Sequence, residues 1–248
     1  MARKKIVLFI VEGPSDDIAL GVILNQIYDK DAVHIEIMYG DITTRKGVVS
    51  QNIVSKLGEV VKSFAKSRHY KYSDFKQIVH LVDTDGAYIP DDNIFEDSSL
   101  KQFLYEDDGI HAASKESAII RNEVKRDNLL RLIKTGKIWQ VPYRVYYMSC
   151  NLDHVLHGKR NSTEEEKEND AYSFAKKYRR DRDRFVDFIC NSDFSINNGY
   201  KESWDYIQQE LNSINRHTNL CICIAEEMEA QEKSKKEEKT QDIDEMSK

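Results

Sequence analysis

The chain has 248 residues, of which 40% are hydrophobic and 32% charged, and it contains only ten glycines and three prolines. This balance supplies enough apolar side chains for a buried core, and it excludes a disordered chain and a fibrous repeat. The formal net charge is −6, but residues 226–248 hold nine acidic and five basic side chains, so the rest of the chain is close to neutral. A body close to neutral can still hold a basic groove for nucleic acid, because binding depends on how charge is distributed.

The sequence shows no segment that would place the chain in a membrane. No apolar run approaches the roughly 18 residues needed to span a bilayer. The longest run, residues 6–11, is too short for the apolar region of a signal peptide, and no small-residue cleavage site follows it. We therefore expect a cytoplasmic protein with no membrane contact. The four cysteines fit no C-x-x-C spacing and are predicted to be free, buried thiols: Cys150, Cys190, Cys221 and Cys223.

The first third of the chain alternates between two kinds of pattern. Short apolar runs at residues 5–11, 33–38 and 78–82 predict buried strands. Between them, residues 15–28 and 48–64 carry apolar side chains at helical spacing. This order of elements predicts an α/β fold with a parallel sheet and right-handed crossovers.

The middle of the chain interrupts this alternation. Residues 90–114 are acidic and aperiodic and predict a surface loop, and residues 117–134 predict a helix of mixed character. We assign both to an acidic insertion at about residues 87–137. A further strand is predicted at residues 141–148, which completes an α/β domain of residues 1–158.

The rest of the chain is predicted to be a helical extension, residues 159–225. Residues 163–189 form one long helix or two, and Ser162 and Thr163 provide a cap at the start. Another helix is predicted at residues 200–215. Residues 226–248 form a charged tail, either helical or disordered.

Three acidic residues follow predicted strands. Glu12 comes directly after the first strand, and Asp83 and Asp85 come after the third. Ligands of parallel α/β sheets bind beyond the carboxyl ends of the strands. Residues i and i+2 of an extended segment point to the same side, so we expect Asp83 and Asp85 to converge on one cation. If the first and third strands are neighbours, Glu12 faces this pair, and Mg²⁺ is the hard cation that would compensate the three carboxylates.

At this point the sequence resembles a known family. Residues 10–17, Ile-Val-Glu-Gly-Pro-Ser-Asp-Asp, are similar to the first motif of Toprim domains, in which a strand ends in Glu-Gly before a helix. Residues 80–86, His-Leu-Val-Asp-Thr-Asp-Gly, are similar to the Asp-x-Asp motif of the same domains. The resemblance covers about residues 4–155. It implies a Toprim-type, Rossmann-like sheet flanked by helices.

A third segment extends the resemblance. Residues 151–156, Asn-Leu-Asp-His-Val-Leu, are similar to a segment of OLD-type nucleases and of stand-alone Toprim effectors of phage defence. There an acidic residue helps to hold a second metal ion, which implies that role for Asp153. A helical addition without an ATPase in the same chain resembles the small protein of AbiL-like abortive-infection pairs. The resemblance implies an SMC-like ATPase as a separate partner, and the chain itself has no P-loop motif.

The resemblance implies a nuclease that uses one or two Mg²⁺ or Mn²⁺ ions to cleave DNA or RNA, tRNA included. Asp83 and Asp85 would bind the metal, and Glu12 would be a second-metal ligand or the general acid/base. The charge and position of four basic residues predict substrate contacts: Arg45, Lys46, Lys115 and Arg121. The sequence leaves open whether the chain forms a homo-oligomer.

Two other functions remain open at this stage. In a phosphatase of the haloacid-dehalogenase type, Asp83 would be the nucleophile and Asp85 the acid/base, but that motif normally follows the first strand and gives Glu12 no role. The other alternative is a non-catalytic regulatory or binding subunit that holds a partner through its helical part and its charged tail.

Overall fold

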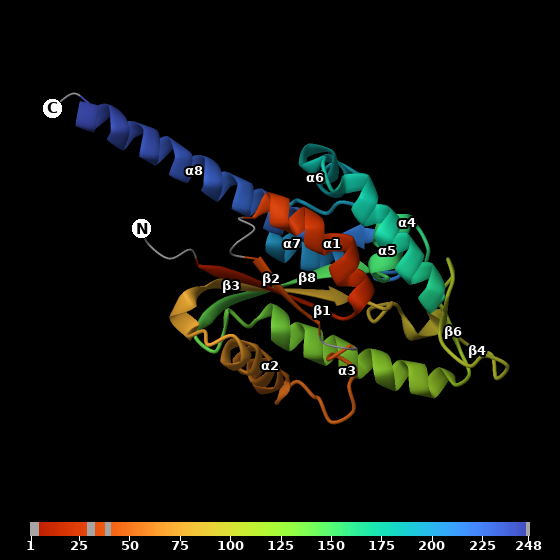
Figure 1. Cartoon of the computed structure of the whole chain (residues 1–248). Coiled ribbons are helices and arrows are strands. Elements are labelled where there is room, and N and C mark those ends of the chain that lie inside the picture. The colour runs from red at the N-terminus through yellow and green to blue at the C-terminus, as the bar shows by residue number, and fades with distance from the viewer. Residues whose placement is uncertain (1–4, 29–32, 38–40, 247–248) are drawn as a thin grey trace.

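The computed structural model describes residues 5–28, 33–37 and 41–246, and it shows an α/β fold in which helices cover both faces of a central sheet (Figure 1). The strand order is β2-β1-β3-β8-β7, and β9 also pairs with β8. Neighbours among β2, β1, β3 and β8 are parallel, whereas β7 and β9 run antiparallel to β8. The strand bounds are β1 Ile6–Val11, β2 Val33–Ile37, β3 Phe75–Asp83, β7 Lys137–Ile138, β8 Val141–Ser149 and β9 His217–Thr218.

The sheet is buried on both faces, because its strands alternate apolar side chains between two cores. In β1 every residue is buried, with Phe9 in one hydrophobic cluster and Leu8 and Ile10 in the other. The first face is covered by α1 Pro14–Ile27, α4 Leu152–His157, α5 Glu164–Tyr178, α6 Arg182–Cys190 and α8 Leu220–Met246. The second is covered by α2 Ile53–Ser67, α3 Lys115–Ile133 and α7 Tyr200–Ile207.

The acidic stretch between β3 and α3 has regular structure that its sequence pattern does not indicate. It forms a small sheet of three short strands, β4 Ile94–Glu96, β5 Leu104–Tyr105 and β6 Ile110–Ala112, in the order β4-β6-β5. The helix α3 lies beside α2 on one side of the main sheet (Figure 1), and Leu129 and Leu132 pack into that core. It therefore serves as the crossover helix between β3 and β8.

Several element bounds differ from the sequence expectation for local reasons. The predicted helix at residues 48–64 begins only at Ile53, because Asn52 closes a turn by accepting from Val49 N and donating to Gly47 O. Residues 163–189 form two helices, and Asp181 caps the second by accepting from Arg184 N. The helix predicted at residues 200–215 ends at Ile207.

The charged tail is helical in its described part. It continues α8, which extends past the body of the protein (Figure 1). Gln231 anchors the helix by donating to Ile27 O, and Lys76 pairs with Glu227. Residues 247–248 of the tail and Met38 of the predicted second strand lie outside the described residues.

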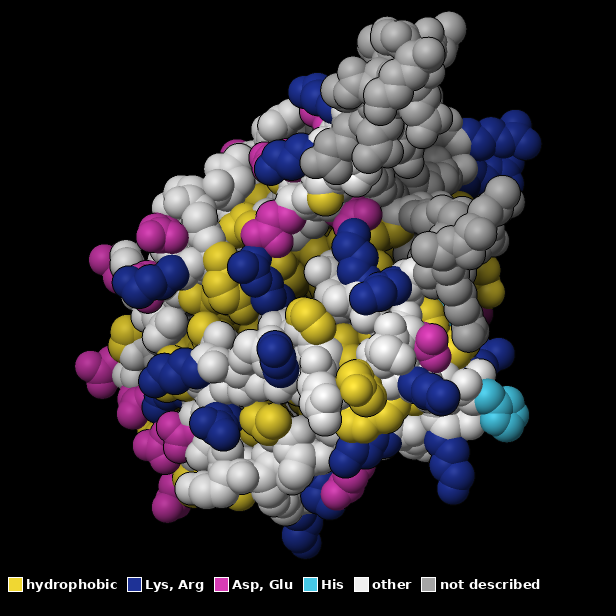
Figure 2. Space-filling model, turned by 90° about the vertical axis from the view of Figure 1, so that its left-hand side faces the viewer, with side chains coloured by type: hydrophobic (Ala, Val, Ile, Leu, Met, Phe, Trp, Pro, Cys, Tyr) yellow, Lys and Arg dark blue, Asp and Glu magenta, His cyan; other side chains and the backbone are white. Residues whose placement is uncertain are grey.

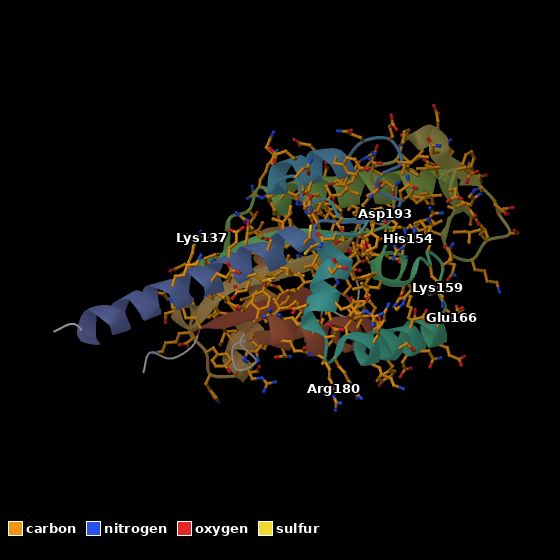
Figure 3. All side chains as sticks on the ribbon, turned by 90° about the horizontal axis from the view of Figure 1, so that it is seen from above. Lys137, His154, Lys159, Glu166, Arg180 and Asp193 are labelled. Carbon is orange, nitrogen blue, oxygen red and sulfur yellow. The ribbon has the colours of Figure 1, made fainter. Side chains whose placement is uncertain are left out.

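Figure 2 views the end of the molecule from which α8 extends, where lysines and arginines are spread between apolar and acidic side chains. Lys137 lies toward this end, whereas His154 and Lys159 lie toward the opposite one (Figure 3).

None of the helices in the described part of the chain is long and apolar enough to cross a membrane. All four cysteines are free, and only Cys190 is partly exposed.

Candidate active site at the carboxyl edge of the sheet

Glu12 and Asp83 meet across two neighbouring strands. The strands β1 and β3 pair in parallel, with Ile10 opposite His80, so their carboxyl ends lie at the same edge of the sheet. The expectation that these strands are neighbours is thus confirmed. Glu12 Oε1 accepts a hydrogen bond from the backbone N–H of Asp83 at 3.3 Å.

Asp85 reaches the same edge by a route that the sequence argument did not foresee. The strand β3 ends at Asp83, and Asp85 has a left-handed φ of 48°, so the expectation of one extended segment carrying both aspartates is wrong. Asp is among the few residues that tolerate this conformation. The turn is held from distant segments, because Asp85 N donates to Cys150 O and Gly86 N donates to Ser213 O.

Gly86 closes this turn against the insertion. Its φ is 65°, and a Cβ at this position would approach Ile110 Cδ1 to 2.9 Å. A residue without a side chain is therefore required where the turn meets β6. The small sheet of the insertion thus packs directly against the turn that carries Asp85.

A lysine from α3 lies fully buried between two of the acidic residues. Lys125 Nζ donates to Asp41 Oδ2 at 2.7 Å and also contacts Asp85 Oδ2. Burial alone would lower the pKa of Lys125, but Asp41 and Asp85 hold that pKa well above its ordinary value. Burial would likewise raise the pKa of Asp41, and Lys125 with the hydrogen bonds from Thr43 brings it down to about 2. These shifts favour the charged forms of Lys125 and Asp41 at neutral pH, and Lys125 also pairs with Asp85.

Glu12 and Asp83 are in the opposite electrostatic situation. Among the described residues, neither forms an ion pair. Burial raises the pKa of Glu12 well above its ordinary value, and the nearby charges of Asp41 and Asp85 add to the rise. Burial also raises the pKa of Asp83, followed by repulsion from Glu12 and Asp85. The edge of the sheet therefore gathers more acidic groups than Lys125 pairs with.

The acidic residues at this edge are chemically suited to a divalent cation. Carboxylate oxygens are the donors that Mg²⁺ and Mn²⁺ prefer, and a cation beside Glu12 and Asp83 would offset the burial and the repulsion that raise their pKa values. Within the described ranges, however, no three His, Cys, Asp or Glu side chains already form a ligand group. The chemistry of the donors fits a cation, and the side chains would have to close on it.

Asp153 borders the same cavity as the three acids, together with Asp16. Asp153 lies in the first turn of α4, and burial raises its pKa to about 6. The preceding residue, Leu152, donates its backbone N–H to Asp83 Oδ1 at 3.0 Å, which ties α4 to the end of β3. Asp16 accepts from the backbone N–H groups of Glu12 and Gly13, so it orients the Glu12 turn.

The cavity has a volume of about 640 Å³ and is walled by segments far apart in the sequence. Glu12, Asp83 and Asp85 lie on its floor. The insertion contributes Gln102, Phe103 and Tyr105 to one wall, and the start of the helical extension contributes Arg160, Asn161, Ser162, Glu164 and Lys167 to the other. Figure 3 shows Lys159 and Glu166, which flank this second wall, on the same side of the molecule as His154.

The predicted substrate contacts are distributed around the site. Arg121 is the nearest, since its Nη1 donates to the backbone O of Asp85 at 2.9 Å. Arg45 and Lys46 lie in the loop that follows Asp41, and Lys115 begins α3, where its backbone N–H donates to Glu96. None of the four predicted contacts, Arg121 included, borders the cavity, whereas Arg160 and Lys167, which the sequence did not indicate, do.

The sequence of α3 contains a pattern that indicates a buried position for Lys125. The buried positions of α3 are Ala118, Asn122, Lys125, Asn128, Leu129 and Leu132, which recur at helical spacing. Polar residues in the middle of an otherwise apolar stripe indicate a buried polar network. Arg160, Lys167 and Tyr105 have no such signal, because only the tertiary structure brings their segments to the sheet edge.

Comparisons of this chain with protein-family models, with curated proteins and with solved structures found no match. The function therefore has to be inferred from the site.

Proposed function

We propose that this chain is a Toprim-type nuclease that hydrolyses phosphodiester bonds of DNA or RNA with the help of Mg²⁺ or Mn²⁺. The observation that carries the proposal is the hydrogen bond from Asp83 N to Glu12 Oε1, which sets two acidic residues together beside Asp85 on the floor of an open cavity. Acidic groups that are buried and perturbed in a cleft are a frequent mark of a functional site.

We assign the following roles to the residues of this chain. Asp83 and Asp85 would hold one ion, and Glu12 with Asp153 would hold a second, or Glu12 would act as general acid/base. Bound ions of this kind activate water and neutralise the developing charge on a phosphate. Lys125 holds Asp85 in place through an ion pair, and Arg160 and Lys167 border the cavity where substrate phosphates would lie.

The biological setting of the proposal comes from the resemblance to abortive-infection pairs. In this setting the nuclease acts against phage infection and is restrained by a separate SMC-like ATPase. The exposed side chains of α5 and α6 offer surface for such a partner. Assembly of this chain with copies of itself is compatible with the same arrangement.

The experiment that tests the proposal is a cleavage assay with the purified chain. Plasmid, single-stranded DNA and total tRNA are incubated with Mg²⁺ or Mn²⁺, alone and with the partner ATPase. We expect metal-dependent cleavage of at least one substrate, abolished in Asp83→Asn and Glu12→Gln and retained in Asp91→Asn, an exposed acid of the insertion.

The two alternatives predict other outcomes in the same assay. A phosphatase would hydrolyse para-nitrophenyl phosphate, depend on Asp83 and tolerate Glu12→Gln. A non-catalytic subunit would cleave nothing. Cleavage that persists in both Asp83→Asn and Glu12→Gln would contradict the proposed site.

A further inference from the structure

The cavity above the acidic residues is bridged by protein. The backbone of Tyr105 in β5 forms two hydrogen bonds with the side chain of Asn161, one from Tyr105 N to Oδ1 at 3.0 Å and one from Nδ2 to Tyr105 O at 2.9 Å. Arg160 next to it pairs with Asp107 of the insertion. The insertion and the start of the helical extension are thus joined over the cavity.

The connection between the insertion and the helical extension restricts the size of the ligand that can reach Glu12, Asp83 and Asp85. A cavity of about 640 Å³ is of the size that encloses a small ligand. A double helix that keeps its bases paired and stacked is far larger than such an enclosure. The phosphates of a duplex lie on its outer surface, but a base can enter the cavity only when its nucleotide has left the stack, as in enzymes that act on flipped or single-stranded bases.

Two aromatic rings line the wall formed by the insertion. Phe103 and Tyr105 both border the cavity, and each is held close to Asp85. The Phe103 ring lies against the guanidinium of Arg121, with Cζ 4.4 Å from the ring centroid, and Arg121 in turn donates to Asp85 O. The Tyr105 hydroxyl lies 3.4 Å from Asp85 Oδ1. Both rings are therefore positioned beside the floor.

The charges around the cavity complement an unstacked nucleotide. Arg160 and Lys167 border the same cavity as the two rings, and each also pairs with an acidic residue, Arg160 with Asp107 and Lys167 with Glu164. Beneath Phe103, Arg121 Nε and Nη2 are buried without a hydrogen-bond partner among the described residues. Aromatic faces beside cations are the combination that binds single-stranded nucleic acid with little sequence preference.

We propose that the cavity binds one unstacked nucleotide of a single-stranded nucleic acid, with its base against Phe103 and Tyr105 and its phosphate toward Glu12 and Asp83. This inference rests on the proposed function, because the floor of the cavity is the proposed active site. It goes beyond that function by naming the substrate form: single strands, loops and frayed ends, in which a base is free to enter the cavity.

Binding of oligonucleotides tests the proposal without relying on catalysis. Fluorescence anisotropy compares a labelled single strand, the same strand with abasic sites, and a blunt duplex hairpin, as DNA and as RNA, in Ca²⁺ and in EDTA. We expect the single strand to bind at least tenfold more tightly than the duplex or the abasic strand. Stacking of a base on an aromatic ring contributes about 1–3 kcal/mol, so Tyr105→Leu and Phe103→Leu should each weaken binding by about 5- to 150-fold.

The variants separate stacking from other causes. Tyr105→Phe retains the ring and should bind within about twofold of the parent chain, whereas Tyr105→Leu retains only apolar bulk. Tyr172→Ala, which removes an exposed aromatic ring of α5, serves as the matched control, because Tyr172 does not border the cavity. Circular dichroism confirms that each variant is folded.

The outcomes distinguish this inference from the proposed function. Equal binding of duplex and single strand, equal binding by Tyr105→Leu, or no binding of any oligonucleotide would overturn the inference. If Asp83-dependent cleavage of duplex still occurred, the proposed function would stand without it. Single-strand binding that depends on Tyr105, with no cleavage of any substrate, would support the inference and contradict the nuclease.

Discussion

Glu12 Oε1 lies 3.3 Å from the backbone nitrogen of Asp83, although the two residues are 71 positions apart in the chain. The contact exists because β1 and β3 are adjacent and parallel, so that both residues leave the sheet at the same edge. Burial raises the pKa of both carboxyl groups, and the charge of Glu12 adds to the rise for Asp83. The two residues therefore respond together to pH, to metal and to substitution.

In metal-free buffer at pH 7.5, we expect Glu12→Gln to be more stable than the parent chain. The pKa of Glu12 is raised in the folded state, so ionisation removes stability as the pH rises through that pKa, and Gln avoids this loss. Thermal unfolding measures the effect, at about 2–4 °C for each kcal/mol of unfolding free energy.

The same experiment has two internal controls. The advantage of Glu12→Gln should shrink at pH 4.5, and Mg²⁺ should stabilise the parent chain more than the variant. Glu123→Gln, an exposed acid of α3, should show neither effect. A Glu12→Gln variant that is less stable than the parent under every condition would argue against uncompensated charge at the site.

Lys125→Met should destabilise the fold strongly. The substitution leaves Asp41 and Asp85 without their buried cation, and breaking such a pair costs about 3–5 kcal/mol. Urea unfolding measures the loss. Adding Asp41→Asn to Lys125→Met should restore part of it, because one of the two unpaired charges is then absent.

The control for this prediction is Lys134→Met at the exposed end of α3. It should change the unfolding free energy by less than about 0.5 kcal/mol, as is usual for surface substitutions. If Lys125→Met were no more destabilising than Lys134→Met, the buried ion pairs would not contribute to the fold.

Asp153 should make metal affinity depend on pH near 6. Burial raises the pKa of its carboxyl group to about 6, so below that pH a proton competes with the cation, and above it the carboxylate is free to bind. Titration calorimetry with Mg²⁺ at pH 5, 6 and 7.5 should show affinity rising with pH. Asp153→Asn should reduce this slope, and an unchanged slope would remove Asp153 from the proposed ligands.

Asn161→Ala should loosen the insertion from the helical extension. The change removes two hydrogen bonds to the Tyr105 backbone, each worth about 0.5–1.5 kcal/mol. Hydrogen–deuterium exchange should accelerate at residues 104–112 and remain unchanged in β1 and β3. Asn169→Ala, an exposed position of α5, is the control and should alter neither region.

The strand–helix alternation of the first 86 residues was predictable because it depends on local patterns. Continuous apolar runs give strands buried on both faces, and the order of elements then favours a parallel sheet. The helix at residues 117–134 was also predicted, and it corresponds to α3. Its position against the main sheet was not predicted, because its buried face mixes apolar with polar residues. Leu129 and Leu132 lie on the same face as Asn122, Lys125 and Asn128.

The structure of the acidic insertion could not be predicted from local sequence patterns. Its strands β4, β5 and β6 have only two or three residues each, too few for any alternation to be recognised. They exist because the main fold holds their ends, with Gly86 packed against Ile110 and Asn161 bound to the edge of β5. Such contacts join residues that no local pattern relates.

The sequence alone determined which acids follow the strands, since Glu12 and Asp83 each end a buried apolar run. Only the tertiary structure decided what surrounds them: Lys125 beneath, Tyr105 and Phe103 on one wall, and Arg160 and Lys167 on the other. The physical reason is that strand formation depends on neighbouring residues, whereas the charge and shape of a site depend on segments that meet only when the hydrophobic cores on both faces of the sheet are formed.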